Sequence, residues 1–407
     1  MIESLNREGR LLFAARAVRT FAFGWLSVVL ALFLARRGLS SGQIGLVFTA
    51  TMVEDALLTM LLSSVAARRG PARIMAWTAP LITVGGVLLV IADDPRVLIL
   101  GAVLGTLSPN GQEAGPFSPM EQAILPDTVP LSVRNRAFSW YNVFGFLPAA
   151  LGALAAGIWL ETARLRGLDD LAAYRGMLWA YSAAGVLLAL LYARLSNLRG
   201  NGGVALPAEG RVARGGLHRS RRVVLELSAL QGLDALAGGF IIQSLLAYWF
   251  HLRFGVGAEA LGPLFFGTNL LSALSFLAAS RLADRLGLLN TMVFTHLPSN
   301  VLLLAVPFMP TFPLAAAVLL ARHVLSQMDV PARQAYTVAL VAPDERPAAA
   351  GFTTSVRALA QSIAPALSGT AMATAATGLP FFLAGGLKIV YDLCLYARFR
   401  KVPLRSD

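Results

Sequence analysis

Residues 109–126 read PNGQEAGPFSPMEQAILP and interrupt an apolar stretch that begins near Val97. The segment holds four prolines, two glycines and two glutamates, Glu113 and Glu121. Each proline or glycine weakens helical hydrogen bonding. Whether such a segment is a surface loop or a functional interruption depends on the sequence that flanks it.

The flanking sequence is typical of a membrane protein. The 407-residue chain is 56% hydrophobic and only 14% charged, whereas soluble domains have about 25% charged residues. A membrane helix needs about 20 mostly apolar residues, and twelve stretches qualify. The first has no small-residue cleavage site before it, so we interpret it as a membrane helix and not a signal peptide. The twelve lie near 11–35, 42–66, 73–92, 97–124, 136–160, 176–198, 222–250, 259–281, 290–308, 312–340, 348–372 and 378–398.

A segment rich in glycine and arginine separates two groups of six spans. We therefore predict an N-terminal six-helix bundle over 1–198, a cytoplasmic linker over 199–221 and a C-terminal bundle over 222–407. The net charge is +12, and arginine supplies almost all of the positive charge. Nucleic-acid binding would need a basic face on a soluble fold, so we favour the alternative that positive loops orient the chain, with both termini cytoplasmic.

The two groups of spans repeat each other. Residues 63–70 read SSVAARRG and residues 280–287 read SRLADRLG, each after the second span of its group. Gln122, Arg134 and Gly157 recur at one constant spacing. Their counterparts are Gln334, Arg346 and Gly369. Repeats of this kind predict an all-α membrane protein of twelve helices in two pseudo-symmetric bundles.

On these residues the chain resembles the bacterial, twelve-helix type of the major facilitator superfamily. That family carries a G-x-L-A-D-R-x-G-R turn between its second and third helices, often echoed between the eighth and ninth. The resemblance implies that the turns tie helix ends together in one access state; the alternative is that their arginines only set orientation. The second copy keeps Asp284, Arg285 and Gly287. The first keeps Arg68, Gly70 and Arg73 but has Ala67 in place of the aspartate.

The resemblance also implies that the first, fourth, seventh and tenth spans line a central cavity. Ionisable side chains inside a bilayer are costly and are by default functional candidates. Glu113, Asp234 and Asp329 are therefore our first cavity residues. Glu113 is the leading candidate for a proton carrier, with capping of the broken backbone as the alternative. For Asp329 the alternative is an ion pair with Arg333, one turn away.

The other charged residues of the spans are placed by helix geometry and by the repeat. Glu54 and Asp55 point about 100° apart on a helix, so we expect only one to face the cavity and the other to pair with Arg357. Glu121 aligns with Arg333 in the repeat, which predicts an ion pair that closes an inner gate. We expect Arg16 and Arg19 to extend towards the interface, and Lys388 and Asp392 to form a structural pair. His296 and His323 lack partners at metal-ligand spacing.

These observations favour a secondary active transporter of a small solute, coupled to protons. We predict no cofactor and no enzymatic activity, because the chain has no phosphate-binding loop and no clustered nucleophile and base. The fifth span, NVFGFLPAALGALAAG (142–157), partly matches the signature of exporters, so an antiporter working in efflux is favoured over uptake of a metabolite. The expected solute is lipophilic or cationic. A non-transporting membrane sensor is the other alternative. We expect a monomer in the bacterial cytoplasmic (plasma) membrane that contacts lipid and no nucleic acid.

Overall fold

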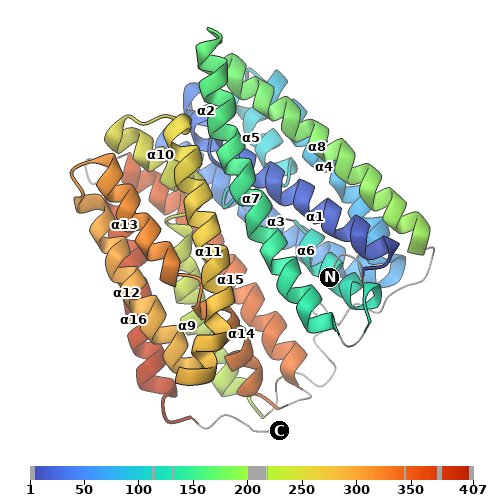
Figure 1. Ribbon diagram of the computed structural model, residues 1–407, viewed down its shortest axis with the longest axis vertical. Helices are drawn as coiled ribbons and strands as arrows, with labels where there is room; N and C mark the ends of the chain where they lie inside the picture. The colour runs from blue at the N-terminus through green and yellow to red at the C-terminus, as the bar shows by residue number, and fades with distance from the viewer. Residues whose placement is uncertain are drawn as a thin grey trace.

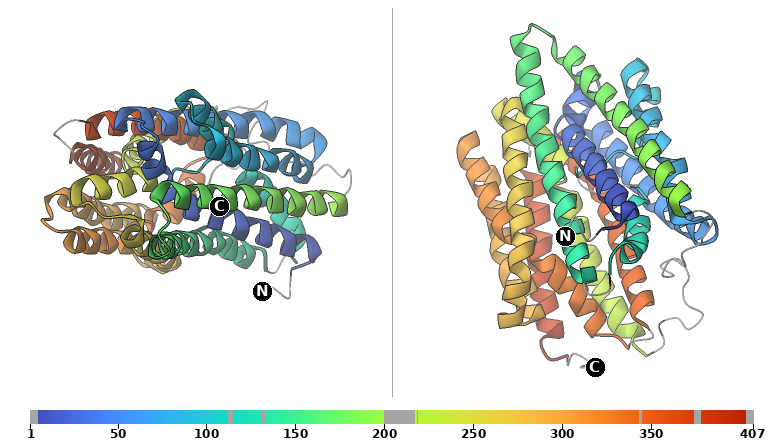
Figure 2. Two further views of the ribbon diagram at one scale, coloured as in Figure 1. Left: turned by 90° about the horizontal axis from the view of Figure 1, so that it is seen from above. Right: turned by 45° about the vertical axis from the view of Figure 1, so that its right-hand side comes forward.

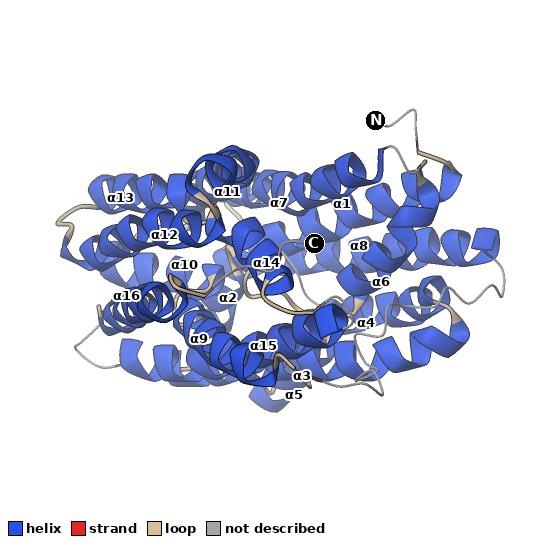
Figure 3. Ribbon diagram, turned by 90° about the horizontal axis from the view of Figure 1, so that it is seen from below, coloured by secondary structure: helices blue, strands red, loops and turns tan. Residues whose placement is uncertain are grey.

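The computed structural model describes residues 5–111, 115–130, 133–199, 217, 219–342, 345–373 and 378–402. These residues form helices joined by loops (Figures 1 and 3). The helices of the first half are α1 (Arg7–Ser27), α2 (Leu30–Arg36), α3 (Ser41–Arg69), α4 (Pro71–Ile91), α5 (Pro95–Leu104), α6 (Phe117–Ile124), α7 (Arg134–Leu165) and α8 (Asp170–Arg199). Those of the second half are α9 (Arg221–Gly239), α10 (Gln243–Phe254), α11 (Ala258–Leu286), α12 (Leu288–Ala305), α13 (Phe312–Leu325), α14 (Asp329–Ala339), α15 (Arg346–Met372) and α16 (Leu379–Phe399).

Most of these helices have the length and composition of membrane spans. Six single helices qualify, namely α3, α4, α7, α8, α12 and α16, and two bent pairs qualify together, α1 with α2 and α9 with α10. The helices α11 and α15 have 29 and 27 residues. The pairs α5–α6 and α13–α14 complete the order of twelve predicted from the sequence.

Four of the twelve spans are interrupted, and they hold matching places in the two halves. The fourth span breaks between α5 and α6, at the proline-rich segment 109–126, and the tenth span breaks between α13 and α14, just before Pro331. The first and seventh spans, predicted as continuous, are also broken, with bends of 43° and 40°. Freed backbone groups inside a membrane need partners from protein or water, so the four breaks mark the interior of the molecule.

The repeated turn between the second and third spans of each half has one backbone shape. Gly70 has φ +86° and Gly287 has φ +81°, a region that favours glycine. Each amide donates to the carbonyl four residues earlier at 2.9 Å, Gly70 to Ala66 and Gly287 to Ala283. The sequence repeat is therefore also a structural repeat.

The halves pack through two crossings, α3 with α15 and α7 with α11. Glycine makes both crossings close: a Cβ on Gly369 would lie 2.9 Å from the Cα of Gly45, and a Cβ on Gly157 would lie 3.2 Å from that of Gly262. Small residues allow membrane helices to approach in this way. Gly157 and Gly369 are counterparts in the repeat, so the two crossings are pseudo-symmetric.

The halves also meet where α2 contacts α10, and otherwise each half forms its own bundle (Figures 1 and 2). Contacts within the first half are dominated by α4 with α8 and α1 with α7, and those within the second by α9 with α15 and α12 with α16. The predicted linker lies largely outside the described residues. The helices that flank it end at Arg199 and begin at Arg221, and the division of the chain at this linker stays a prediction.

Candidate functional site

A cavity of about 300 Å³ lies in the second half, beside the breaks in the interrupted spans. Its lining is mostly polar. The charged members are two carboxylates, Asp234 and Asp329, and four basic side chains, Arg322, Arg333, Arg357 and Lys388. Amides and hydroxyls from α10, α11 and α13–α15 complete the polar lining, among them Gln243, Asn269, Ser272, Ser326 and Gln361.

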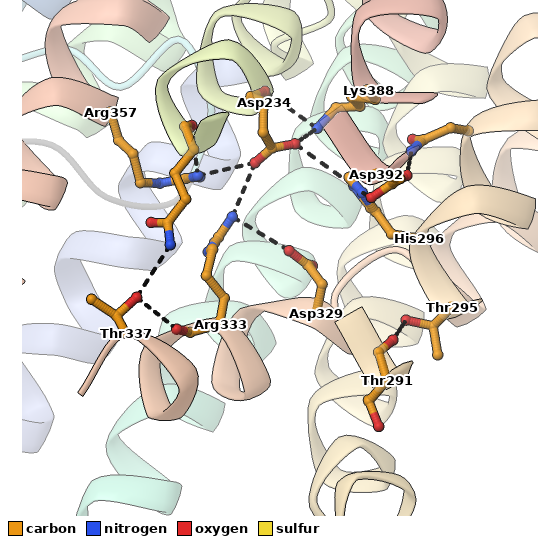
Figure 4. Close-up of polar contacts among 12 residues, drawn as sticks. Asp234, Thr291, Thr295, His296, Asp329, Arg333, Thr337, Arg357, Lys388 and Asp392 are labelled. Atoms are coloured by element: carbon orange, nitrogen blue, oxygen red, sulfur yellow. Dashed lines mark hydrogen bonds and ion pairs between the residues drawn. The ribbon is translucent and has the colours of Figure 1, made fainter. Parts of the chain in front are cut away.

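Asp234, on α9, is the centre of the charges around this cavity (Figure 4). Its Oδ2 accepts hydrogen bonds from Arg333 and Arg357, each at 3.0 Å. Its Oδ1 accepts one from Lys388 at 2.5 Å. The side chain of Asp234 is only 3% exposed. A carboxylate this deeply buried is stable only when it is paired, and here one anion holds three cations from three other spans.

A second layer fixes the partners of Asp234. Asp329 pairs with Arg333 at 3.3 Å, which confirms the predicted pair one turn apart. His296 lies 3.8 Å from Asp234 through Nε2 and contacts Asp392 through Nδ1 at 2.9 Å. The expected pair of Lys388 with Asp392 is wrong: Lys388 turns to Asp234, and Asp392 accepts hydrogen bonds from His296 and Asn300.

The broken spans close one side of the cavity by bonding to one another across the two halves. Gln243, at the start of α10, donates from its side-chain amide to Ser27 Oγ at 2.7 Å. The Ser244 hydroxyl donates to the carbonyl of Ser27 at 2.8 Å, and its backbone amide donates to the carbonyl of Pro109 at 2.9 Å. The breaks in the first, fourth and seventh spans thus satisfy part of each other's polar backbone. Both Gln243 and Asn110 also line the cavity.

The first half holds a different ion cluster around Glu121, on α6. The carboxylate bonds to Arg19 at 2.5 Å, to the Tyr141 hydroxyl at 2.7 Å and to the Tyr192 hydroxyl at 2.6 Å. Arg16 lies 3.6 Å from the carboxylate and stacks over the Tyr141 ring. Glu121 and Arg19 are fully buried. The expectation that Arg16 and Arg19 extend towards the interface is therefore wrong: a buried carboxylate holds both inside the bundle.

The predicted gate pair of Glu121 with Arg333 is not formed in this conformation. The partners of Glu121 all belong to the first half, and those of Arg333, Asp234 and Asp329, belong to the second. Because each charge is satisfied within its own bundle, the gate pair would require both clusters to come apart.

The acids of the second span do not pair with Arg357, whose carboxylate partner is Asp234. Asp55 accepts a hydrogen bond from the backbone amide of Gly115, in the break of the fourth span. Glu54 is half-buried, and its Oε2 has no hydrogen-bond partner within the described ranges. Neither acid lines the cavity described above. Glu113, the leading candidate for the proton carrier, lies outside the described residues.

The side chains of the repeated turns are mostly exposed. Arg68, Asp284 and Arg285 are exposed at helix ends, and Arg73 is half-buried in the first turn of α4. Asp284 forms no ion pair with another described residue in this conformation. The predicted tie through Asp284 is absent here, and a gating role for the turns stays a prediction.

Sequence reasoning missed several residues of this site. Lys388 had a signal, because it is one of two lysines in the chain and lies inside an apolar span. Its spacing from Asp392 pointed to the wrong partner. The cavity role of Arg322 and the contact of His296 with two carboxylates had no local signal, because both depend on how α12 and α13 are rotated against α9 and α16.

Comparison with known proteins gives the same architecture. Residues 12–365 match the sequence model of the Major Facilitator Superfamily. A relative in Saccharomyces cerevisiae, named the uncharacterized membrane protein YJR124C, is 25% identical over 428 residues, which cover 98% of this chain and 96% of the yeast protein.

Among solved structures, a point mutant of the nucleoside transporter NupG superposes with a TM-score of 0.74 at 13% identity, covering 97% of this chain and all of that one. A bacterial homologue of the human lysosomal transporter Spinster, in an inward-facing and unoccupied conformation, gives 0.75 at 14% identity and 98% coverage of both chains. A POT family peptide transporter gives 0.73 at 14% identity, covering 99% of this chain and 98% of that one. At these identities the likeness shows the twelve-helix fold.

Proposed function

The chain belongs to the major facilitator superfamily and is a membrane transporter, and from this premise we propose that it is a secondary active carrier of a small hydrophilic solute. The carrier works by alternating access, in which two six-helix bundles rock around a site between them. The observation that carries the proposal is the polar cavity around Asp234, at the breaks of the interrupted spans. Interrupted helices at matching positions are the usual place for a transporter's solute site.

The contacts between the halves support one access state. The cavity is closed on one side by Gln243, Ser244, Ser27 and Pro109, which hydrogen-bond across the two halves. These bonds are few and neutral, and such bonds contribute about 1 kcal/mol each. They can break and re-form as the bundles rock. We propose that this structure is the inward-facing state, which is also the state of the Spinster homologue it resembles.

The cavity revises the solute expected from composition. A lipophilic or cationic solute would need an apolar or acidic lining. The lining is instead polar, with four basic side chains against two carboxylates. We therefore propose a hydrophilic solute. The neighbours named as nucleoside and peptide transporters show that this fold accommodates polar cargo.

Proton coupling and efflux remain part of the proposal. An inward proton supplies about 2.3 kcal/mol per 100 mV of membrane potential. Glu54 and Glu113 are the candidate carriers, and Glu54 has a buried oxygen with no partner among the residues described. In the fifth span, Gly152 packs against the backbone of α1 and Gly157 against that of α11. These glycines belong to the partial match to the signature of exporters, which supports an antiporter that works in efflux. Uptake of a metabolite is the alternative.

We also propose that the protein is a monomer. Both termini are proposed to lie on the cytoplasmic side, because the arginine-rich linker and turns fall on that side. The bacterial cytoplasmic membrane stays a prediction. A sensor on the same scaffold is disfavoured by the cavity, since a sensor has no need of a mid-membrane cavity lined with charged groups.

The test begins with a thermal-shift screen of the purified protein against hydrophilic solutes, followed by counterflow of the best binder in proteoliposomes. We expect counterflow in the native protein and its loss in Asp234→Asn, because three cations then lose their shared partner. Glu54→Gln should keep solute counterflow but lose proton uptake. Binding without counterflow in the native protein would support the sensor and contradict the carrier.

A further inference from the structure

Arg322 differs from every other basic side chain around the cavity. It lies in the last turn of α13, just before the break in the tenth span. It is only 7% exposed, and it lines the cavity. No hydrogen bond or ion pair joins its guanidinium to another described residue, and its Nε is fully enclosed without a partner. A buried guanidinium that bonds to no carboxylate is costly. Asp234 and Asp329 act on the charge of Arg322 from a distance, so its donors are available for a partner that the described residues do not supply.

The carboxylates of the cavity are already engaged. Asp234 is bound by Arg333, Arg357 and Lys388, and Asp329 is bound by Arg333. The lining therefore carries four positive charges against two negative ones, an excess of two, and Arg322 is the one of the four that bonds to no described residue. A solute that brings its own negative charge would balance the cavity, whereas a cationic solute would add to the imbalance.

A second unpartnered group lies one helical turn from Arg322. Ser326 is buried and lines the cavity, and its Oγ has no hydrogen-bond partner among the described residues. The backbone amide of Ser326 donates to the carbonyl of Arg322 at 3.0 Å, which keeps the two residues in helical register. Residues four apart on a helix share one face, so a guanidinium and a hydroxyl donor are available together at one place.

We propose that Arg322 and Ser326 form the subsite for an anionic group, a carboxylate or a phosphate, of the carried solute. This inference rests on the proposed function and narrows its solute to an organic anion. The guanidinium matches the planar oxygens of such groups and binds them by charge-assisted hydrogen bonds. The Ser326 hydroxyl supplies one further donor. The network around Asp234 stays intact when the anion binds, because its cations already have partners.

The proposed subsite predicts that Arg322→Gln weakens anion binding without lowering the melting temperature of the solute-free protein. Arg322→Gln removes an unpaired buried charge, so the solute-free protein should melt no lower than the native protein. The same substitution should weaken anion binding about tenfold or more, because it removes a charge-assisted contact. A purely structural role for Arg322 predicts the reverse, a lower melting temperature with an unchanged response to anions.

The experiment uses the full-length purified protein, with succinate and inorganic phosphate as probes and succinamide as the uncharged match for succinate. The melting temperature of the native protein should rise with succinate or phosphate and stay unchanged with succinamide. Arg322→Gln should lose this rise, Arg322→Lys should keep part of it, and Ser326→Ala should reduce it. Arg253→Gln, at an exposed arginine on α10, is the matched control and should respond as the native protein does.

Three results would overturn the subsite: an equal response to succinamide, an equal response to chloride alone, or an anion response that persists in Arg322→Gln. If Arg322→Gln fails to fold, Ser326→Ala and Arg322→Lys test the subsite instead, and a rise in melting temperature with succinate or phosphate as large as in the native protein would overturn it. Anion binding without counterflow would refute the carrier and leave the subsite standing. Counterflow of an uncharged solute, with no anion response, would refute the subsite and leave the carrier standing.

Discussion

The two halves bury ion clusters at corresponding places, but with the signs reversed. In the first half, Arg19 of the first span binds Glu121 of the fourth. In the second half, Asp234 of the seventh span binds Arg333 of the tenth. Glu121 and Arg333 align in the sequence repeat, so the two pairs join the same spans of the two halves, the first with the fourth and the seventh with the tenth.

The clusters differ in how completely they are satisfied. Glu121 has two arginines and two tyrosine hydroxyls around it and is sealed from solvent. Asp234 has three cations, and its surroundings open onto a cavity that also contains the unpaired Arg322. We infer that the first cluster holds its bundle rigid, while the second is arranged for a solute that completes it.

The largest expected effect on stability is that of Glu121→Gln. Removal of this charge leaves Arg19 buried without its counter-charge, and breaking a buried pair costs about 3–5 kcal/mol. The free energy of unfolding in detergent measures the loss. The control is Glu226→Gln, which breaks exposed pairs with Arg222 and Arg398 and should cost less than about 1 kcal/mol. Equal losses for both variants would remove the distinction between a sealed cluster and a surface pair.

Tyr192→Phe should have the next largest effect. It deletes one hydroxyl that donates to Glu121 at 2.6 Å and leaves the ring stacked on Phe117. A hydrogen bond to a charged group contributes about 1.5–3 kcal/mol. Denaturant unfolding should show this loss, with counterflow per folded molecule unchanged. A selective loss of transport would mean that the first cluster takes part in the cycle.

Asp329→Asn should destabilise the protein less, by about 1–2 kcal/mol, because Arg333 keeps its contact with Asp234. Its effect on solute binding should exceed its effect on unfolding, since Asp329 lines the cavity. Measuring both quantities on one sample separates them. A change in stability as large as that of Glu121→Gln would show that both clusters are structural.

Asp284→Asn should have the smallest effect, within about 0.5 kcal/mol, because the side chain is exposed and has no ion-pair partner among the described residues. A gating role for Asp284 would require this side chain to be paired in the opposite access state, although it is unpaired among the described residues in this one. A transport rate unchanged by this substitution would leave the turns with orientation as their only role.

Much of the fold followed from the sequence, because its signals are local. Apolar length predicted the spans, the SRLADRLG repeat predicted the two halves, and clustered prolines predicted the break in the fourth span. The break between α1 and α2 contains neither proline nor glycine, since residues 27–30 read SVVL. That bend is fixed by hydrogen bonds from Gln243 and Ser244 of the other half, which are not local.

The site was predicted only in part, for a related reason. Burial of a charge in lipid singled out Asp234 and Asp329, and the structure places both at the cavity. Their partners depend on the rotation of neighbouring helices. Spacing along one helix therefore paired Asp329 with Arg333 correctly and Lys388 with Asp392 wrongly.

The central claim is that the solute occupies the cavity of the second half and not the cluster of the first. Single cysteines test it in a Cys394→Ser background, with a membrane-permeant thiol reagent and the solute found in the screen. The two substitutions are Ser272→Cys and Thr20→Cys. Ser272 lines the cavity, and Thr20 lies beside Arg16 of the sealed cluster. We predict that the cysteine at position 272 is labelled and that the solute slows its labelling, while the cysteine at position 20 stays unlabelled. Protection at position 20, with none at position 272, would contradict the account.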